Sequence, residues 1–193
     1  MYAIHRKARV LLGLLAALGV AACEERGAPE NALSPVFSSA SVSAENDTVV
    51  AVFRTNPVGS LTANIGPHKL SIPAGAVCAP ALSGYGAAYW DLPCAPALGG
   101  IEITAKAWTM PNGHAMVSFS PDLRFAPTAE VLLYLRDKDV AMGDGLTILY
   151  CDAANACIDE SIADPSLATR FDLRSGFVYR RIKHFSGYMV AMD

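Results

Sequence analysis

His184 and Ser186 stand two residues apart, on either side of Phe185, near the end of the chain. A histidine imidazole can act as a general base toward a serine hydroxyl, and a hydroxyl activated in this way is a nucleophile. The pair therefore has the residue types of acyl chemistry. Ser186 and Gly187 also interrupt the last strand-like stretch. This interruption favours a structural interpretation, in which the strand bends here and His184 is buried and hydrogen-bonded. We expect this structural role and no catalytic activity.

The remaining histidines give weaker signals. His68 and His114 lie near predicted turns, far apart in sequence. Either histidine could bind a metal, but we expect both to lie at the surface. The sequence shows no convincing Ser-His-Asp order, phosphate-binding glycine loop or pair of catalytic carboxylates. We therefore predict no metal and no cofactor.

Cysteines past residue 23 occur in an even number, which in an exported protein predicts disulfides. They are Cys78, Cys94, Cys151 and Cys157. Three pairings are possible, and proximity in sequence favours 78 with 94 and 151 with 157. Their spacings differ from the Cys-x-x-Cys pairs that are typical of zinc sites.

The loop between the first two of these cysteines carries clustered aromatic residues among glycine and alanine, namely Tyr85, Tyr89 and Trp90. Tyrosine and tryptophan dominate the energetics of many interfaces, so the cluster is a candidate surface for binding a partner. The alternative, which we favour, is that these rings fold back and cover the edge of a sheet.

Residues 1–22 read as an export signal, with Arg6, Lys7 and Arg9 preceding an uncharged apolar run from Val10 to Ala22. The run is shorter than the ~20 residues that span a bilayer. Two small residues then precede Cys23, a pattern that resembles the bacterial lipoprotein signal. We expect Cys23 to carry the lipid, which would anchor the protein to a membrane of the bacterial cell envelope, with the domain in the periplasm or at the cell surface.

The segment 23–47 is rich in Ser, Ala, Pro and Glu, and we expect a flexible tether. Without residues 1–22, the chain keeps 12 basic and 18 acidic residues, a formal net charge of −6. An acidic domain of this kind argues against nucleic acid as a partner.

From residue 48 to residue 193 the chain alternates between short β-rich runs and turn residues, with no helical stripe. This pattern predicts an all-β fold, an antiparallel β-sandwich. In the run from Phe177 to His184, residues 178, 180, 182 and 184 share one face, and we expect Arg180 to lie at the rim of the sheet or to snorkel along apolar surface. The predicted strands are 48–54, 61–65, 68–72, 100–107, 115–120, 129–136, 146–151, 169–173, 177–184 and 188–191.

Several stretches together resemble the ZU-five domain, the β-sandwich of ankyrins and netrin receptors, and its bacterial envelope relatives. They are Ile72-Pro73-Ala74-Gly75-Ala76-Val77, Val117-x-Phe119-x-Pro121 with Phe125-x-Pro127, Val131-x-Leu133-x-Leu135, and the stretch from His184 to Ala191. The resemblance covers about residues 60–193. Residues 78–99 look inserted relative to the family, so ligands of eukaryotic relatives are not carried over.

The resemblance also implies a specific reaction. Some ZU-five relatives cleave themselves at His-Phe-Ser, with the serine attacking the preceding carbonyl. Cleavage at the Phe185–Ser186 bond would release the residues from Ser186 to Asp193. Our first expectation is a lipid-anchored protein whose sandwich binds another envelope protein or a polymer. The alternatives are self-processing by His184 and Ser186, and a purely structural lipoprotein.

Overall fold

Strands with alternating buried and exposed side chains form the framework of the domain, as a computed structural model shows for residues 41–45, 47–142 and 145–192. Period-two alternation places every second side chain on the same face of a strand. In β3, for example, Leu61, Ala63 and Ile65 are buried, whereas Thr62 and Asn64 are exposed. Such strands bury one face only, so a second sheet must cover it.

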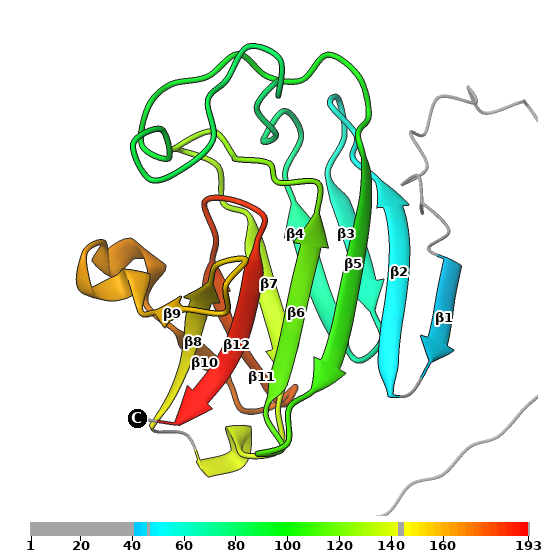
Figure 1. Cartoon of the computed structure of the whole chain (residues 1–193), viewed down its shortest axis with the longest axis vertical. Helices are drawn as coiled ribbons and strands as arrows, with labels where there is room; N and C mark the ends of the chain where they lie inside the picture. The colour runs from blue at the N-terminus through cyan, green and yellow to red at the C-terminus, as the bar shows by residue number, and fades with distance from the viewer. Residues whose placement is uncertain (1–40, 46, 143–144, 193) are drawn as a thin grey trace, which may run out of the picture. The chain divides into compact units, whose positions relative to one another are not determined.

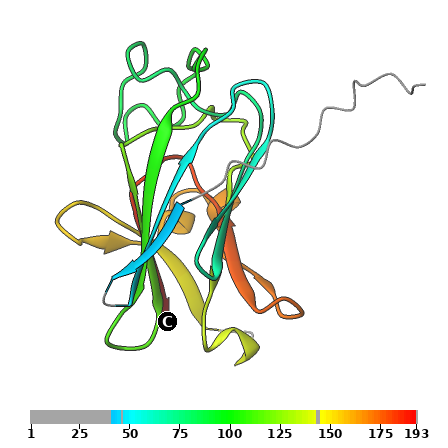
Figure 2. The ribbon, with the colours of Figure 1, turned by 90° about the vertical axis from the view of Figure 1, so that its right-hand side faces the viewer.

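Two antiparallel sheets result (Figures 1 and 2). Their neighbouring strands pair in antiparallel register throughout. The seven-stranded sheet has the order β1 (Ser41–Glu45), β2 (Thr48–Arg54), β5 (Glu102–Thr109), β6 (Ala115–Ser120), β12 (Gly187–Met192), β8 (Leu146–Cys151) and β9 (Cys157–Ile158). The five-stranded sheet has the order β10 (Arg170–Asp172), β11 (Phe177–Arg181), β7 (Leu132–Arg136), β4 (His68–Ile72) and β3 (Leu61–Ile65).

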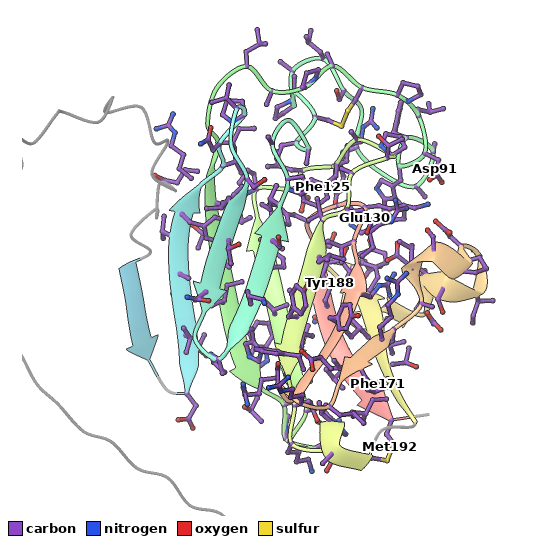
Figure 3. All side chains as sticks on the ribbon, turned by 180° about the vertical axis from the view of Figure 1, so that it is seen from behind. Asp91, Phe125, Glu130, Phe171, Tyr188 and Met192 are labelled. Atoms are coloured by element: carbon purple, nitrogen blue, oxygen red, sulfur yellow. A yellow bond between two sulfur atoms is a disulfide. The ribbon has the colours of Figure 1, made fainter. Side chains whose placement is uncertain are left out.

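One hydrophobic core lies between the sheets. Phe53, Val117 and Val190 contribute to it from the larger sheet, and Leu70 and Leu133 from the smaller one. Figure 3 shows Tyr188 in the middle of the domain and Phe125 nearer the end that carries the long loop. The prediction of an all-β antiparallel sandwich is confirmed.

Short 3-10 turns occupy three connections in the described part of the chain: η1 (Val140–Met142), η2 (Glu160–Ile162) and η3 (Pro165–Leu167). Asp159 caps η2, since its carboxylate accepts a hydrogen bond from the Ser161 amide. Within the described residues, no helix has the length and apolar character needed to cross a membrane.

The folded domain begins before residue 48. β1 pairs with β2 inside the range that the sequence predicted as tether, so that prediction is wrong for residues 41–45. The sequence did not predict this edge strand because the segment is rich in serine and shows no apolar alternation. The predicted lipidation site, Cys23, and the predicted signal segment 1–22 lie outside the described residues.

Both disulfides form in the favoured pairing, Cys78 with Cys94 and Cys151 with Cys157. The first closes the loop that contains the aromatic cluster. The second joins β8 to β9 across a turn and precedes η2 by a few residues. Cys151 stands opposite Gly187, the first residue of β12, so this disulfide lies next to the turn that carries His184 and Ser186.

Candidate functional site

Three segments that are distant in sequence meet at the beginning of β12. The turn before β12 supplies His184, Phe185 and Ser186, the disulfide-closed loop 78–99 supplies Tyr85, and η2 supplies Glu160. Figure 1 shows this loop above the turn that leads into β12. We call these five residues the β12 site.

His184 is completely buried and hydrogen-bonded through both ring nitrogens. Its Nε2 lies 3.1 Å from Glu160 Oε1, and its Nδ1 lies 3.2 Å from the Ser186 hydroxyl. A carboxylate only accepts hydrogen bonds, so a neutral His184 carries its proton on Nε2. Its Nδ1 is then an acceptor that faces the Ser186 hydroxyl, and the Tyr188 hydroxyl lies 3.4 Å from the same nitrogen.

Glu160 is also buried, and both of its oxygens are used. Oε1 accepts from His184, and Oε2 accepts from Arg180 at 2.9 Å. Arg180 is fully buried and donates a second bond to the Ile148 carbonyl at 2.6 Å. The prediction that Arg180 lies at the rim is wrong, because its place on the inner face of β11 buries the guanidinium, which then requires a buried anion.

Tyr85 connects the loop to the peptide bond between Phe185 and Ser186. Its hydroxyl donates to the Phe185 carbonyl oxygen at 2.6 Å and lies 2.8 Å from Ser186 Oγ. Burial raises the pKa of Tyr85 to about 12, although the bond with Ser186 opposes the shift. Tyr85 therefore stays protonated at neutral pH and remains a donor to this carbonyl.

Backbone contacts on each side hold the same peptide bond in place. The Phe185 amide donates to the Leu123 carbonyl at 2.7 Å, and the Ser186 carbonyl accepts from the Phe119 amide at 3.0 Å. The Phe185 ring is buried, stacks on Phe119 and meets Phe125 edge-on. The Phe185 carbonyl is thus fixed toward Tyr85.

The aromatic loop folds back on the domain. Trp90 stacks on the His184 ring, with centroids 3.8 Å apart, and its indole nitrogen is buried without a hydrogen-bond partner in the described part of the chain. Tyr85 and Tyr89 are 38% and 44% exposed, so the loop offers tyrosine rather than tryptophan surface to a partner. Tyr150, near the end of β8, meets the His184 ring edge-on.

Two basic residues fasten the loop over the site. Arg124 donates to the carbonyls of Tyr89 and Leu92, at 2.8 and 2.7 Å. Lys183 pairs with Asp91 of the loop and with Asp164 next to η3. The hydrogen bond from Lys183 holds the pKa of Asp164 well below its usual range.

An open cavity of about 480 Å³ borders Ser186. Its walls come from the ends of β6 and β8, from the turn between β8 and β9, and from Tyr85. Water therefore reaches the serine side of the site, whereas His184 on the other side is fully buried.

His68 and His114 are buried, contrary to the expectation of surface histidines. His114 Nδ1 lies 3.2 Å from Asp137, and Asp139 is near enough to complete a cluster of potential metal ligands. The Asp137 carboxylate also accepts from the Ala115 and Asp139 amides, which is a structural role in the β6–β7 region. This cluster is remote in sequence from the β12 site.

Sequence reasoning missed Glu160, which no motif marks. A signal existed in Arg180, because an arginine in register with the inward-facing Val178 and Ile182 implies a buried anion nearby. Tyr85 was singled out as a binding residue, but its hydrogen bond to Phe185 requires a contact that only the fold provides.

Comparison of the chain with known proteins gives no further information about the site. No family model, no curated protein and no solved structure matches this chain.

Proposed function

We propose that this domain cleaves its own Phe185–Ser186 peptide bond and belongs to a lipid-anchored protein of the bacterial envelope. One observation carries the proposal: the Ser186 hydroxyl lies against the acceptor nitrogen of a histidine that is held by a carboxylate, next to a carbonyl that accepts from a tyrosine. Base, nucleophile and oxyanion donor are the parts that acyl transfer requires.

The reaction begins with proton transfer. Ser186 has one hydroxyl proton and two acceptors within reach, Tyr85 and His184 Nδ1. When His184 takes this proton, Ser186 Oγ attacks the Phe185 carbonyl carbon, and Tyr85 stabilises the negative oxygen that forms. Glu160 stabilises the resulting imidazolium.

Collapse of this intermediate exchanges one bond for another. The bond from the Phe185 carbon to the Ser186 nitrogen breaks, and His184 returns the proton to that nitrogen. Phe185 is then joined to Ser186 Oγ by an ester, and Ser186 has a free amine. Water from the adjacent cavity hydrolyses the ester, leaving a carboxylate on Phe185 and restoring the hydroxyl.

The released segment would stay in the fold. β12 pairs with β6 on one side and β8 on the other, and its Tyr188 and Val190 side chains are fully buried. Cleavage would therefore produce a two-chain domain whose last strand is held noncovalently.

Trapping the ester tests this function. Hydroxylamine added to the full chain at neutral pH converts the ester to a hydroxamate on Phe185, located by fragment mass. We expect this product in the wild type and in Ser186→Cys, which keeps a nucleophile, and not in Ser186→Ala. Equal reaction of the wild type and Ser186→Ala at this bond would reject the proposal.

The membrane anchor is a separate part of the proposal. It rests on the basic start of the chain, the short apolar run and the small residues before Cys23. Labelling with a radioactive fatty acid in a bacterial host tests it directly. The wild-type chain should incorporate label and Cys23→Ser should not, and label in both would contradict lipidation at Cys23.

Binding of an envelope protein or polymer through the aromatic loop is a second candidate function. The exposed side chains of this loop favour it, since Leu82 is 78% and Leu98 94% exposed, and Tyr89 is exposed as well. A photo-crosslinking residue at position 89 in living cells should give a defined product that a crosslinker at the exposed Leu173, far from the loop in sequence, does not give. Identical product patterns from both positions would contradict a loop-specific partner.

A further inference from the structure

We propose that the cavity beside Ser186 binds an organic cation, a primary ammonium or guanidinium group on an apolar stem. The proposal concerns the walls of the cavity and does not depend on self-cleavage. At about 480 Å³, the cavity has the size of a small-molecule site.

The charged residues in its walls are acidic. Asp122 and Asp152 line the cavity, and no basic side chain of the described residues does so. Neither carboxylate takes part in a salt bridge among the residues that the structure describes. Lys106 stands opposite Ser118 in the β5–β6 register, so it flanks one edge without lining the cavity. Two carboxylates without a cationic partner favour a ligand of positive charge.

Aromatic rings form much of the remaining wall. Trp108, Tyr150 and Tyr85 line the cavity together with Met116. The faces of aromatic rings attract ammonium and guanidinium groups, tryptophan most strongly. The rings would also cover the apolar stem of such a ligand, while Ser118 and Asn155 in the same wall are polar.

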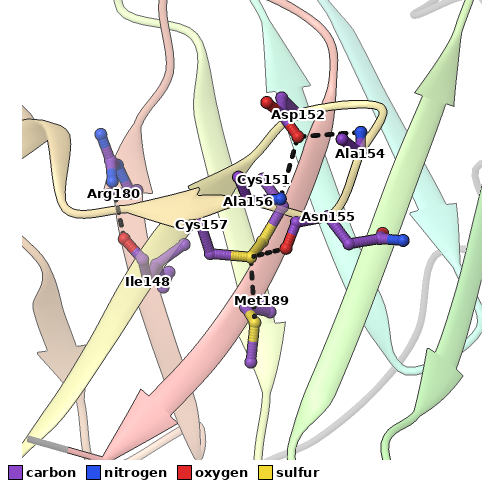
Figure 4. Close-up of a disulfide and its surroundings, with 9 residues drawn as sticks. All are labelled: Ile148, Cys151, Asp152, Ala154, Asn155, Ala156, Cys157, Arg180 and Met189. Atoms are coloured by element: carbon purple, nitrogen blue, oxygen red, sulfur yellow. Dashed lines mark hydrogen bonds between the residues drawn. A yellow bond between two sulfur atoms is a disulfide. The ribbon is translucent and has the colours of Figure 1, made fainter.

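The turn between β8 and β9 is held in a fixed conformation. The disulfide from Cys151 to Cys157 closes this turn, and Asp152 Oδ1 accepts from the Ala154 and Ala156 amides at 2.9 Å each (Figure 4). Cys157 Sγ also lies 3.5 Å from Met189 Sδ on β12, which packs the turn against the sheet. Asp152 is thereby placed before any ligand arrives, which lowers the entropic cost of binding.

Gly187 lets two strands approach closely beside the cavity. A Cβ at this position would lie 3.0 Å from the Cys151 carbonyl oxygen, which is closer than ordinary contacts allow. The glycine therefore lets β12 approach the end of β8 while Ser186 and Gly187 both line the cavity.

Titration of the full-length Ser186→Ala chain tests the proposal, because this variant cannot cleave itself. The probes are cadaverine, an acetylated and amidated lysine-containing peptide, and arginine amide acetylated at its α-amino group. The neutral match is citrulline amide acetylated in the same way. The readout is the indole N–H resonance of Trp108, assigned with Trp108→Phe. We expect saturable shifts with the cations and none with citrulline amide. Binding of cadaverine alone would identify a free amine as the ligand, and binding of the peptide would identify a basic side chain.

Isosteric variants supply the control. Asp122→Asn and Asp152→Asn should each weaken cation binding about tenfold, since each removes one charge-assisted contact. The amide that Asp152→Asn introduces retains an oxygen for the two turn amides, so the fold is preserved. Asp172→Asn removes the same charge on the other sheet and should leave binding unchanged. Three results would overturn the proposal. One is a shift with citrulline amide as large as the shift with the cations, and another is a shift with a neutral oligosaccharide that does not depend on Asp122 and Asp152. The third is the absence of any saturable shift.

Discussion

The hydroxyl oxygen of Tyr85 lies 2.6 Å from the carbonyl oxygen of Phe185, although 100 residues separate the two in the chain. The loop from residue 78 to residue 99 thus folds back onto the turn before β12, and its Tyr85 donates to the carbonyl of one particular peptide bond. The next residue of that bond, Ser186, lies against His184. This relationship suggests that the loop completes a site rather than only covering a sheet edge.

Replacing Tyr85 by phenylalanine removes the donor and keeps the ring. Loss of one oxyanion donor typically slows acyl transfer by about 10²-fold. We expect a decrease of this order in the rate of cleavage at the Phe185–Ser186 bond, followed by mass spectrometry in denaturant. Tyr89→Phe on the same loop is the control and should react like the wild type. Equal rates for Tyr85→Phe and the wild type would exclude this role of the phenol.

The buried pair of Glu160 and Arg180 makes a prediction about stability. Glu160→Gln leaves the Arg180 guanidinium buried without its anion, which typically costs about 3 to 5 kcal/mol. Urea unfolding in the Ser186→Ala background should show a loss of this size. Asp164→Asn affects a more exposed ion pair with Lys183 and should cost under about 1 kcal/mol. A loss from Glu160→Gln as small as that from Asp164→Asn would contradict the account.

The disulfide between Cys78 and Cys94 should support both stability and cleavage. Replacing both cysteines by serine should lower the free energy of unfolding by about 3 kcal/mol, whereas the shorter Cys151–Cys157 loop contributes about 2 kcal/mol. Because Tyr85 and Trp90 lie within the first loop, the Cys78/Cys94 variant should also lose hydroxamate formation. A fully reactive variant would show that the loop is not needed to place Tyr85.

His68 predicts how stability depends on pH. Burial lowers the pKa of His68 to about 4, and its Nδ1 accepts a hydrogen bond from the Arg136 amide. The unfolded chain therefore binds a proton between pH 6.5 and 4 that the folded chain does not bind. The free energy of unfolding should be unaffected by His68 above this window and should fall by up to about 3 kcal/mol as the pH decreases through it.

A His68→Gln variant provides the comparison for this pH effect, since it lacks the titrating ring. Its unfolding free energy, measured with urea at pH 7 and near pH 4.5, should change less with pH than that of the parent chain. Asp164 does not contribute to the pH dependence in this range. Its pKa is lowered in the folded state, so its stabilising effect is lost only as the pH falls to and below the pKa of an unfolded aspartate, about 3.8. Equal pH dependence of the two chains would contradict the assignment to His68.

The sequence predicts the fold far better than it predicts the site. Alternating burial and turn residues locate strands such as β2, β3 and β6 to the residue, because both signals are local. β1 was missed because its composition resembles that of a tether, and β9 because two residues are too few to show alternation. The position of Arg180 was predicted wrongly, because a charged residue on a strand is expected to be exposed unless the ion that pairs with it is known.

The site itself depends on contacts that are not local. His184 and Ser186 are neighbours in the chain, and their chemistry is visible in the sequence. Glu160 and Tyr85 join them only because η2 and the disulfide-closed loop meet at the start of β12. No periodicity or spacing encodes that meeting, so the sequence showed a nucleophile and a base without the groups that orient them.

The intact mass of the full chain in denaturant tests the central claim most directly, because denaturant separates β12 from the fold if the bond is cut. The account predicts two fragments, ending at Phe185 and beginning at Ser186, whose masses together exceed the uncut chain by one water. Ser186→Ala should give a single intact chain. A wild-type chain that remains uncut on prolonged incubation, with both disulfides formed, would contradict self-cleavage at this bond.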